Sequence, residues 1–159
     1  MAAVGAIDEA NSALGLAAAQ PLGDEHRAMV ARIQNELFDL GADLATPGED
    51  FTPGEMTLRI TAAQVERLER EIDEMNEALA PLTSFILPGG LPAAALLHLA
   101  RAVVRRAERT AVAAAAETSL NPQALTYINR LSDHLFVLAR LLNLAAGGDI
   151  LWRPGATRG

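Results

Sequence analysis

Apolar residues recur at helical spacing in five stretches of the chain, and short polar or glycine- and proline-containing segments separate these stretches. Apolar side chains at intervals of three and four residues form one face of an amphipathic helix. The pattern predicts helices over residues 4–20, 25–46, 61–79, 92–117 and 122–146. Because the helices are long and their connections short, we expect an all-α fold, a five-helix antiparallel bundle that forms a single domain over residues 1–159.

Residues at the expected helix ends agree with this division. Thr61 followed by Gln64 matches a capping box, in which each residue satisfies a free amide of the other. Pro92 suits the first turn of a helix, and Asn121 is a good cap for the helix that follows it. The glycine pair that begins at Gly147 is expected to end the last helix.

The remaining segments are expected to lie outside helices. Residues 48–59 contain two glycines, a proline and several charges, which predicts an exposed loop. Residues 85–90 form an apolar turn segment, and residues 147–159 form a C-terminal tail. No capping residue precedes Val4, and the free amides of a helix start normally need partners. We therefore expect a further segment ahead of the first helix.

Composition narrows the class of protein. Aromatic residues are only 4% of a chain that is 50% hydrophobic, because alanine and leucine dominate, as is typical of helical proteins. The absence of cysteine excludes disulfides and thiolate chemistry and fits a cytoplasmic location. A net charge of −7 argues against a nucleic-acid binder, and no apolar run approaches the roughly 18 residues of a membrane span. We expect a soluble, acidic, cytoplasmic protein.

One predicted helix carries a run of arginines. Arg101, Arg105 and Arg109 are four residues apart and lie on one helix face, with Arg106 and Glu108 beside them. Like charges at this spacing repel each other, so a polyanionic ligand, carboxylates of another helix or subunit, or solvent must offset the repulsion. Arginine donates two parallel hydrogen bonds to phosphate oxygens, which suits a triphosphate. The alternative is a solvated helix face on which Glu108 is the intrahelical partner.

The last predicted helix carries a second polar patch within an apolar pattern. Asn129 and Asp133 are four residues apart, and Arg130 and His134 lie next to them. An asparagine and an aspartate on one face can hydrogen-bond a ribose or a base, or they can hold an arginine in place. From the residues alone, the pattern favours an ordinary polar face, or a bridge between Asp133 and an arginine of another helix.

Three other features leave alternatives open. Asp8 is either a first-turn acid that favours the helix dipole or a partner for the arginines. Phe85 either packs in the core as part of a helix connection or belongs, with the adjacent glycines, to a ligand site. His26, His98 and His134 have no metal-ligand spacing, so no protein metal site is expected.

Four blocks in this order resemble the PduO-type family of ATP:cob(I)alamin adenosyltransferases. They are residues 4–12 (VGAIDEANS), 85–90 (FILPGG), 101–109 (RAVVRRAER) and 129–136 (NRLSDHLF). The resemblance covers most of the chain, and the double-arginine block followed by NRLSD is its most specific part. It implies a five-helix bundle that assembles as a homotrimer, with active sites between neighbouring subunits.

The same resemblance implies a reaction: transfer of the 5′-deoxyadenosyl group of ATP to cob(I)alamin, giving adenosylcobalamin and triphosphate, with Mg²⁺ present. The residues that would contact ATP are Arg105, Arg106, Glu108, Arg109 and Asn129. Those on the cobalamin side would be Phe85, Phe136, Asp133 and Trp152. The catalytic set would be Arg105, Arg101 and Asp8, with Asp8 of one subunit pairing with Arg105 of its neighbour.

One departure from the family keeps other functions open. The family carries a glycine-rich segment with threonine and lysine that wraps ATP, and nothing like it precedes Val4 in this sequence. A trimeric protein that carries cobalamin or a nucleotide without catalysis is therefore the main alternative. A structural bundle whose arginines dock an acidic partner is another. If the chain is an enzyme, we expect hand-over of its product to a cobalamin-dependent enzyme.

Overall fold

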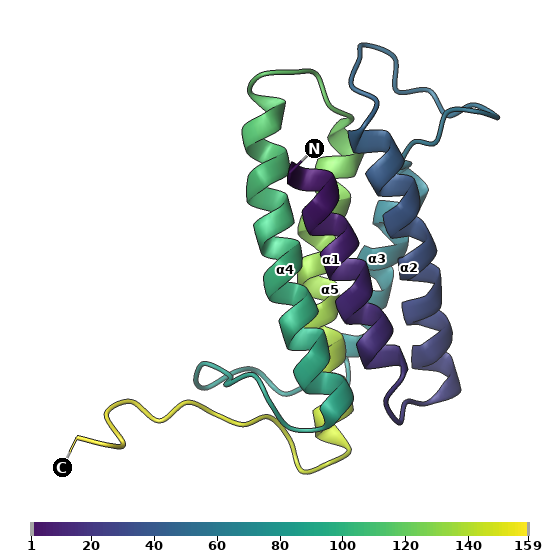
Figure 1. Cartoon of the computed structure of the whole chain (residues 1–159). Helices are drawn as coiled ribbons and strands as arrows, with labels where there is room; N and C mark the ends of the chain where they lie inside the picture. Colours follow the sequence, from purple (N-terminus) through teal and green to yellow (C-terminus); the bar gives the residue numbers. More distant parts are fainter. Residues whose placement is uncertain (1, 159) are drawn as a thin grey trace.

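The computed structural model describes residues 2–158 and has five helices that run alternately up and down (Figure 1). The helices are α1 (Ala2–Ala18), α2 (Asp24–Leu44), α3 (Ala62–Asn76), α4 (Pro92–Ala115) and α5 (Pro122–Leu144). The predicted five-helix antiparallel bundle is therefore confirmed, although α3 ends at Asn76 rather than near residue 79. No helix in the described part of the chain is both long and apolar enough to cross a membrane.

The order of packing follows from the apolar faces. α1 packs between α2 and α4, and α5 packs between α4 and α3. Each helix buries large aliphatic side chains in one shared core, among them Leu14, Ile33, Leu68, Leu97 and Leu131. Burial of such a side chain contributes about 1.5–3 kcal/mol. The core thus holds α4 and α5 side by side as a rigid support for the polar residues on their surfaces.

The predicted helix caps are present. The Gln64 side chain accepts a hydrogen bond from the Thr61 backbone N–H at 2.9 Å. Asn121 accepts one from the Gln123 backbone N–H at 3.0 Å. Gly147 ends α5 with a φ of +102°, a left-handed conformation that favours glycine. The local sequence therefore sets where these helices start and stop.

A buried ion pair at the upper end in Figure 1 fixes the loop between α2 and α3. Arg59 donates to Asp43 at 2.7 Å, and both side chains are buried. The same carboxylate accepts hydrogen bonds from the Ile60 backbone N–H and the Asn121 side chain, both at 2.7 Å. The prediction that residues 48–59 are an exposed loop is therefore wrong at Arg59, whose long side chain reaches into the bundle.

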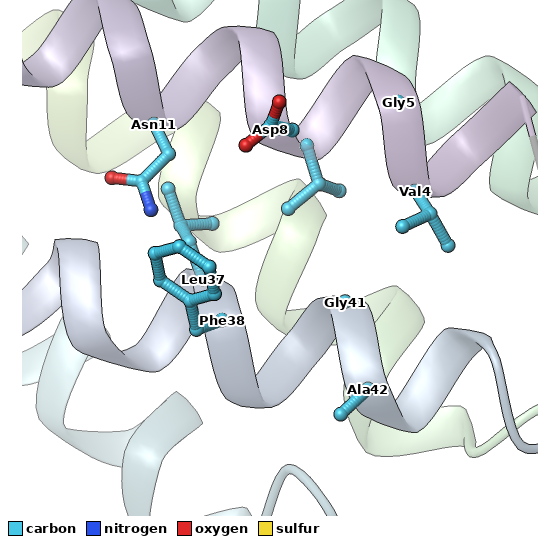
Figure 2. A pocket seen from close by; sticks show the side chains of 9 residues that line it. Val4, Gly5, Asp8, Asn11, Leu37, Phe38, Gly41 and Ala42 are labelled. Carbon is cyan, nitrogen blue, oxygen red and sulfur yellow. The ribbon is translucent and has the colours of Figure 1, made fainter.

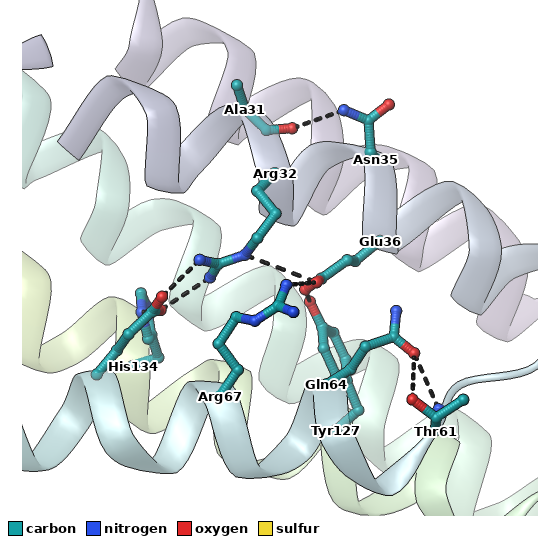
Figure 3. A network of polar contacts seen from close by, with 10 residues as sticks. Ala31, Arg32, Asn35, Glu36, Thr61, Gln64, Arg67, Tyr127 and His134 are labelled. Carbon is teal, nitrogen blue, oxygen red and sulfur yellow. Dashed lines mark hydrogen bonds and ion pairs between the residues drawn. The ribbon is translucent and has the colours of Figure 1, made fainter. Parts of the chain in front are cut away.

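A second polar network lies between α2, α3 and α5 (Figure 3). Arg32 donates two hydrogen bonds to Glu71, at 2.5 and 2.8 Å, and His134 contacts the same carboxylate at 2.8 Å. Tyr127 donates to Glu36 at 2.7 Å. Burial raises the pKa of Tyr127, and the adjacent Glu36 carboxylate raises it further, so the hydroxyl keeps its proton. His134 therefore faces the bundle interior and not the polar patch around Asn129.

The lower end in Figure 1 holds the connector, residues 77–91, and the tail, residues 145–158. The two segments pair at an isolated antiparallel bridge between Ile86 and Leu151. The Leu87 N–H donates to the Ile150 carbonyl, and the Trp152 N–H donates to the Phe85 carbonyl, both at 2.8 Å. The predicted tail is therefore tied to the predicted turn segment by backbone hydrogen bonds.

Candidate functional site

A continuous chain of polar contacts runs across the surface of α4 and α5. Arg105 pairs with Glu108 at 2.5 Å, and Asn129 donates to the same carboxylate group at 2.6 Å. Arg130 donates to Asn129 at 2.5 Å and pairs with Asp133 at 3.1 Å. Asp133 thus bridges to an arginine of its own helix, and not to one of another helix. The two polar patches that the sequence suggested separately form one connected surface.

The arginines of this surface leave most of their hydrogen-bonding capacity unused. We call Arg105, Arg106 and Arg109, with Glu108 and Asn129, the arginine face. The side chain of Arg105 is 46% exposed, whereas its partner Glu108 is only 16% exposed. A guanidinium has five N–H donors. Arg105 uses one nitrogen on Glu108, Arg106 one on Glu9, and Arg109 one on the Arg105 carbonyl. The arginine face therefore keeps donors in solvent that match the oxygens of a phosphate chain.

Asp8 and Glu9 are adjacent on α1 but have different neighbours. Glu9 pairs with Arg106 across the contact between α1 and α4. Asp8 instead lines a groove between α1 and α2, where Asn11 lies beside it and Phe38 lies opposite (Figure 2). Because α1 begins at Ala2, Asp8 is beyond the first turn, and its interpretation as a first-turn acid is wrong. No described residue of the chain forms an ion pair with Asp8.

The groove contains an apolar pocket of about 590 Å³, and Asp8 is one of the residues that line it. Phe38 is 71% exposed there, and Gly41 leaves the α2 backbone open beside Val4. Asp8 is the one ionisable residue among those that line the pocket. The groove is thus apolar with a single unpaired carboxylate among the residues that the structure describes.

A second pocket, which we call the aromatic pocket, lies between the connector, the tail and helices α4 and α5. Its volume is about 620 Å³, and Phe85, Phe136, Trp152 and Arg101 line it. The rings of Phe85 and Trp152 are 5.8 Å apart at an interplanar angle of 59°. Phe85 is 76% exposed, which rules out the interpretation that it packs in the core. Exposure of a phenylalanine beside a pocket is typical of a ligand site.

His98 is buried behind Phe136, one of the residues that line the aromatic pocket, and the sequence did not single it out as a site residue. Its ring packs edge-on against Phe136 at 6.1 Å between ring centres. Burial lowers the pKa of His98, and the positive charge of Arg101 lowers it further, although Asp149 acts in the opposite direction. The imidazole is therefore neutral at pH 7. A neutral ring keeps Arg101 the main positive charge at this pocket.

The structure divides the expected site residues into three groups. Arg105, Arg106, Glu108, Arg109 and Asn129 share the arginine face, with Asp133 at its edge. Arg101 lies one helical turn from Arg105 but belongs to the aromatic pocket with Phe85, Phe136 and Trp152. Asp8 lies apart from both, in the groove between α1 and α2. Within residues 2–158 no group of three or more acidic, histidine or cysteine residues could hold a metal ion.

Helices α4 and α5 thus present an arginine-rich face and an apolar pocket next to each other, a combination that fits a protein with one phosphorylated and one largely apolar ligand. A family model described as cobalamin adenosyltransferase matches residues 1–142. The chain belongs to this family.

Individual relatives agree with the family model. A corrinoid adenosyltransferase from Mycobacterium tuberculosis is 49% identical over 157 residues, which cover 95% of this chain and 78% of the relative. The corresponding enzyme from Mycobacterium leprae is 48% identical over 156 residues, covering 93% and 79%. The fold superposes with a TM-score of 0.84 on a variant PduO-type ATP:corrinoid adenosyltransferase from Lactobacillus reuteri complexed with cobalamin and ATP. That protein is 37% identical, and the match covers 96% of this chain and 84% of the other.

Proposed function

We propose that this corrinoid adenosyltransferase binds ATP on the arginine face and cobalamin in the aromatic pocket. The observation that carries the proposal is that both features lie on the same pair of helices, one turn of α4 apart. Arg105 belongs to the first and Arg101 to the second. One turn of helix is about 5.4 Å, so two ligands bound at these features would lie next to each other.

The reaction is the transfer of a 5′-deoxyadenosyl group from ATP to cob(I)alamin. The cobalt attacks the ribose 5′ carbon with its electron pair and forms a cobalt–carbon bond. The bond between that carbon and the triphosphate oxygen breaks, and the oxygen leaves with the bonding electrons. The products are adenosylcobalamin and triphosphate. No proton transfer is needed at the reacting atoms, so the protein contributes placement and electrostatic stabilisation.

The arginine face would stabilise the leaving triphosphate. Negative charge grows on the leaving oxygen as the bond breaks, and fixed guanidinium groups stabilise that charge more strongly than mobile water does. Glu108 holds Arg105 and Asn129 in place through its two oxygens, at 2.5 and 2.6 Å. We expect Mg²⁺ to bind with the ATP phosphates, since this ion usually keeps several waters and takes few protein ligands.

The aromatic pocket would exclude water from the cobalt. Phe85, Phe136 and Trp152 provide apolar surface, and Arg101 provides one positive charge at its edge. We propose that Phe85 occupies the position of a lower axial ligand of cobalt. Loss of that ligand makes the cobalt easier to reduce, so the reactive cob(I) state forms at a less extreme potential.

We also propose that the functional assembly is a homotrimer with active sites between subunits. Asp8 lies in an apolar groove without an ion-pair partner among the described residues, and exposed Phe38 lies opposite it. A neighbouring subunit that covers this groove would bury Phe38 and bring Arg105 to Asp8. We predict that Asp8→Asn weakens trimer formation and lowers turnover. Sedimentation velocity tests this, and unchanged sedimentation together with unchanged kinetics would contradict the bridge.

The decisive test is an anaerobic assay of the chain with ATP, Mg²⁺ and chemically reduced cobalamin. The corrin absorbance change reports formation of the cobalt–carbon bond. We expect turnover in the wild type and a loss of about 100-fold in kcat/KM for ATP in Arg105→Ala. Arg70→Ala is the matched control, because Arg70 is an exposed arginine on α3, away from α4. Binding of cobalamin without turnover would favour the carrier function instead.

Two further aspects of this proposal concern the cellular setting. We expect a cytoplasmic location, where ATP and reductants are available. We also expect the product to pass to a cobalamin-dependent enzyme, because adenosylcobalamin is itself a cofactor. Co-sedimentation of the product-loaded protein with such an enzyme would test the second expectation.

A further inference from the structure

Asn143, near the end of α5, contacts the connector with both atoms of its amide group. Its side-chain oxygen accepts a hydrogen bond from the Leu91 N–H at 3.0 Å. Its side-chain nitrogen donates to the Gly89 carbonyl at 3.0 Å. Asn143 is only 1% exposed, so water cannot replace these bonds. The residue therefore closes the turn that joins the Phe85 segment to the start of α4.

The backbone of the turn passes very close to this side chain. Gly90 has a φ of +92°, and a Cβ atom at this position would lie 2.2 Å from the Asn143 side-chain oxygen. Only glycine fits both the backbone conformation and the distance. Asn143 and Gly90 thus form one interlocking contact, in which a change to either residue displaces the connector.

The main chain of Asn143 fixes the tail as well. Its carbonyl accepts a hydrogen bond from the Gly148 N–H at 2.8 Å, and the Gly147 N–H donates to Leu144 at 3.4 Å. These two bonds form a Schellman motif, which sets the direction in which the chain leaves α5. The tail then runs back along the connector and brings Trp152 to Phe85. A single residue therefore anchors both segments that carry aromatic side chains to the pocket.

We propose that Asn143 is a positioning residue for the cobalamin side of the site. This inference rests on the proposed function for its catalytic consequence, although its structural part stands without it. Phe85 is 76% exposed, so side-chain packing alone cannot hold it in one place. Its position depends on the backbone of the connector. Asn143 hydrogen-bonds this backbone at Gly89 and Leu91, and the tail pairs with it at Phe85. Asn143 contacts none of the residues of the arginine face, so it acts on one substrate only.

The chemistry of the amide explains why asparagine serves here. The turn offers one N–H and one carbonyl to the same side chain, and an amide can accept from the first while it donates to the second. An aspartate carboxylate could accept from Leu91 but could not donate to Gly89. An alanine could do neither and would leave both backbone groups buried without a partner.

The test uses Asn143→Ala with Asn121→Ala as its matched control. Asn121 is also a buried asparagine, 3% exposed, that holds a loop to the bundle, but it does so at the opposite end of the molecule. Both variants are expected to lower the urea midpoint of unfolding. We expect Asn143→Ala to lower kcat/KM for cob(I)alamin about tenfold while the KM for ATP changes less than about twofold. Asn121→Ala should leave both parameters close to the wild type.

A second readout needs no turnover. Trp152 is the single tryptophan of the chain, so its fluorescence reports the pairing of tail and connector in the free protein. We expect acrylamide to quench Trp152 more strongly in Asn143→Ala than in the wild type, with no change in Asn121→Ala. If Asn143→Ala does not fold, Asn143→Asp replaces it, and the same changes are expected at smaller size.

The two readouts separate failure of the inference from failure of the proposed function. Unchanged quenching in the Asn143 variant, or equal losses of cobalamin and ATP parameters, would overturn the positioning role. A wild type without turnover would overturn the proposed function, and quenching would still decide whether Asn143 sets the geometry of the pocket.

Discussion

A buried asparagine holds a loop to the bundle at each of its two ends (Figure 1), but the groups that the two asparagines contact are different. At the upper end Asn121 belongs to a charged cluster, in which Asp43 accepts from Arg59 and from Ile60. At the lower end Asn143 contacts only backbone groups of the connector and the tail. Both carboxylate oxygens of the first cluster accept hydrogen bonds from within the chain, whereas the segments held by the second asparagine present Phe85 and Trp152 to an open pocket.

This difference indicates that the upper end contributes to stability and the lower end to the ligand pocket. The ion pair at the upper end is buried and both oxygens of its carboxylate are occupied, so we assign it a role in stability. A neutral amide that fixes a backbone turn lets Phe85 stay mostly exposed, with only the Trp152 ring packed against it. At the lower end the apolar side chain of Phe85 is exposed to solvent, which is unfavourable, and the same exposure forms the wall of the aromatic pocket. Substitutions at the two ends should separate loss of stability from loss of turnover.

The largest expected effect is on stability, from Asp43→Ala at the upper end. Removal of this carboxylate leaves the Ile60 N–H without its acceptor and the buried Arg59 guanidinium without a counter-charge, with only backbone carbonyls as partners. The loss of one partner of a buried ion pair costs about 3–5 kcal/mol. Urea unfolding followed by circular dichroism measures it. The folded fraction should keep its kcat for adenosyl transfer, because none of these residues touches the proposed site.

The double variant Asp43→Ala, Arg59→Met refines this prediction. Replacement of both charges removes the uncompensated guanidinium, so the double variant should recover part of the stability lost in Asp43→Ala. If Asp43→Ala alone loses less than about 1 kcal/mol, the buried pair contributes no more to stability than an exposed ion pair does. A large drop in kcat of the folded fraction would contradict the separation of the two ends.

The next effect is on turnover, from Phe85→Ala at the lower end. Phe85 lines the aromatic pocket yet is 76% exposed, so its removal creates no cavity in the core. We expect kcat to fall about 30-fold, equivalent to about 2 kcal/mol in the barrier, while the KM for ATP changes little. The free energy of unfolding should change by less than about 0.5 kcal/mol. Steady-state kinetics with each substrate varied in turn measures the difference.

Leu87→Ala is the control for this prediction. Leu87 lies two residues further along the same connector, is 43% exposed, and does not line the aromatic pocket. It should leave kcat unchanged. Equal losses in Phe85→Ala and Leu87→Ala would mean that the connector tolerates no change, rather than that Phe85 contacts cobalamin.

The helices themselves could be predicted because their signals are local. Apolar residues three and four apart define each buried face, and Thr61, Asn121 and Gly147 mark helix ends through contacts within a few residues. The buried position of Arg59 could not be predicted in this way. Its partner Asp43 is 16 residues away, and helical spacing shows which face a residue occupies without showing which loop side chain reaches it.

In the candidate site, too, contacts between residues close in the sequence could be predicted, whereas contacts between distant residues could not. The pair between Arg105 and Glu108 follows from their spacing of three residues on one helix. The meeting of Phe85 with Trp152 spans 67 residues, and only the resemblance to a family put both on the cobalamin side. Asn143 gave no signal at all, because a polar residue near a helix end is ordinary. Its role depends on a backbone turn 52 residues earlier in the chain.

The smallest expected effect tests whether charge burial stabilises the middle of the bundle as it does the upper end. Burial by itself would raise the pKa of Glu71, but hydrogen bonds from His134 and Arg32, with the positive charge of Arg32, lower it from 4.5 to about 2. A carboxylate with a depressed pKa contributes stability that is complete above pH 4.5 and is lost as the pH falls towards 2. Allowing for partial solvent screening, we expect about 1–2 kcal/mol. Urea unfolding between pH 7 and pH 3 gives the free energy of unfolding of the wild type and of Glu71→Gln, and the two values should converge as the pH falls. Glu69 is an exposed glutamate on the same helix, so Glu69→Gln should have the free energy of unfolding of the wild type at every pH. A constant gap between wild type and Glu71→Gln would mean that Glu71 acts by packing, and that only the upper end derives its stability from charge.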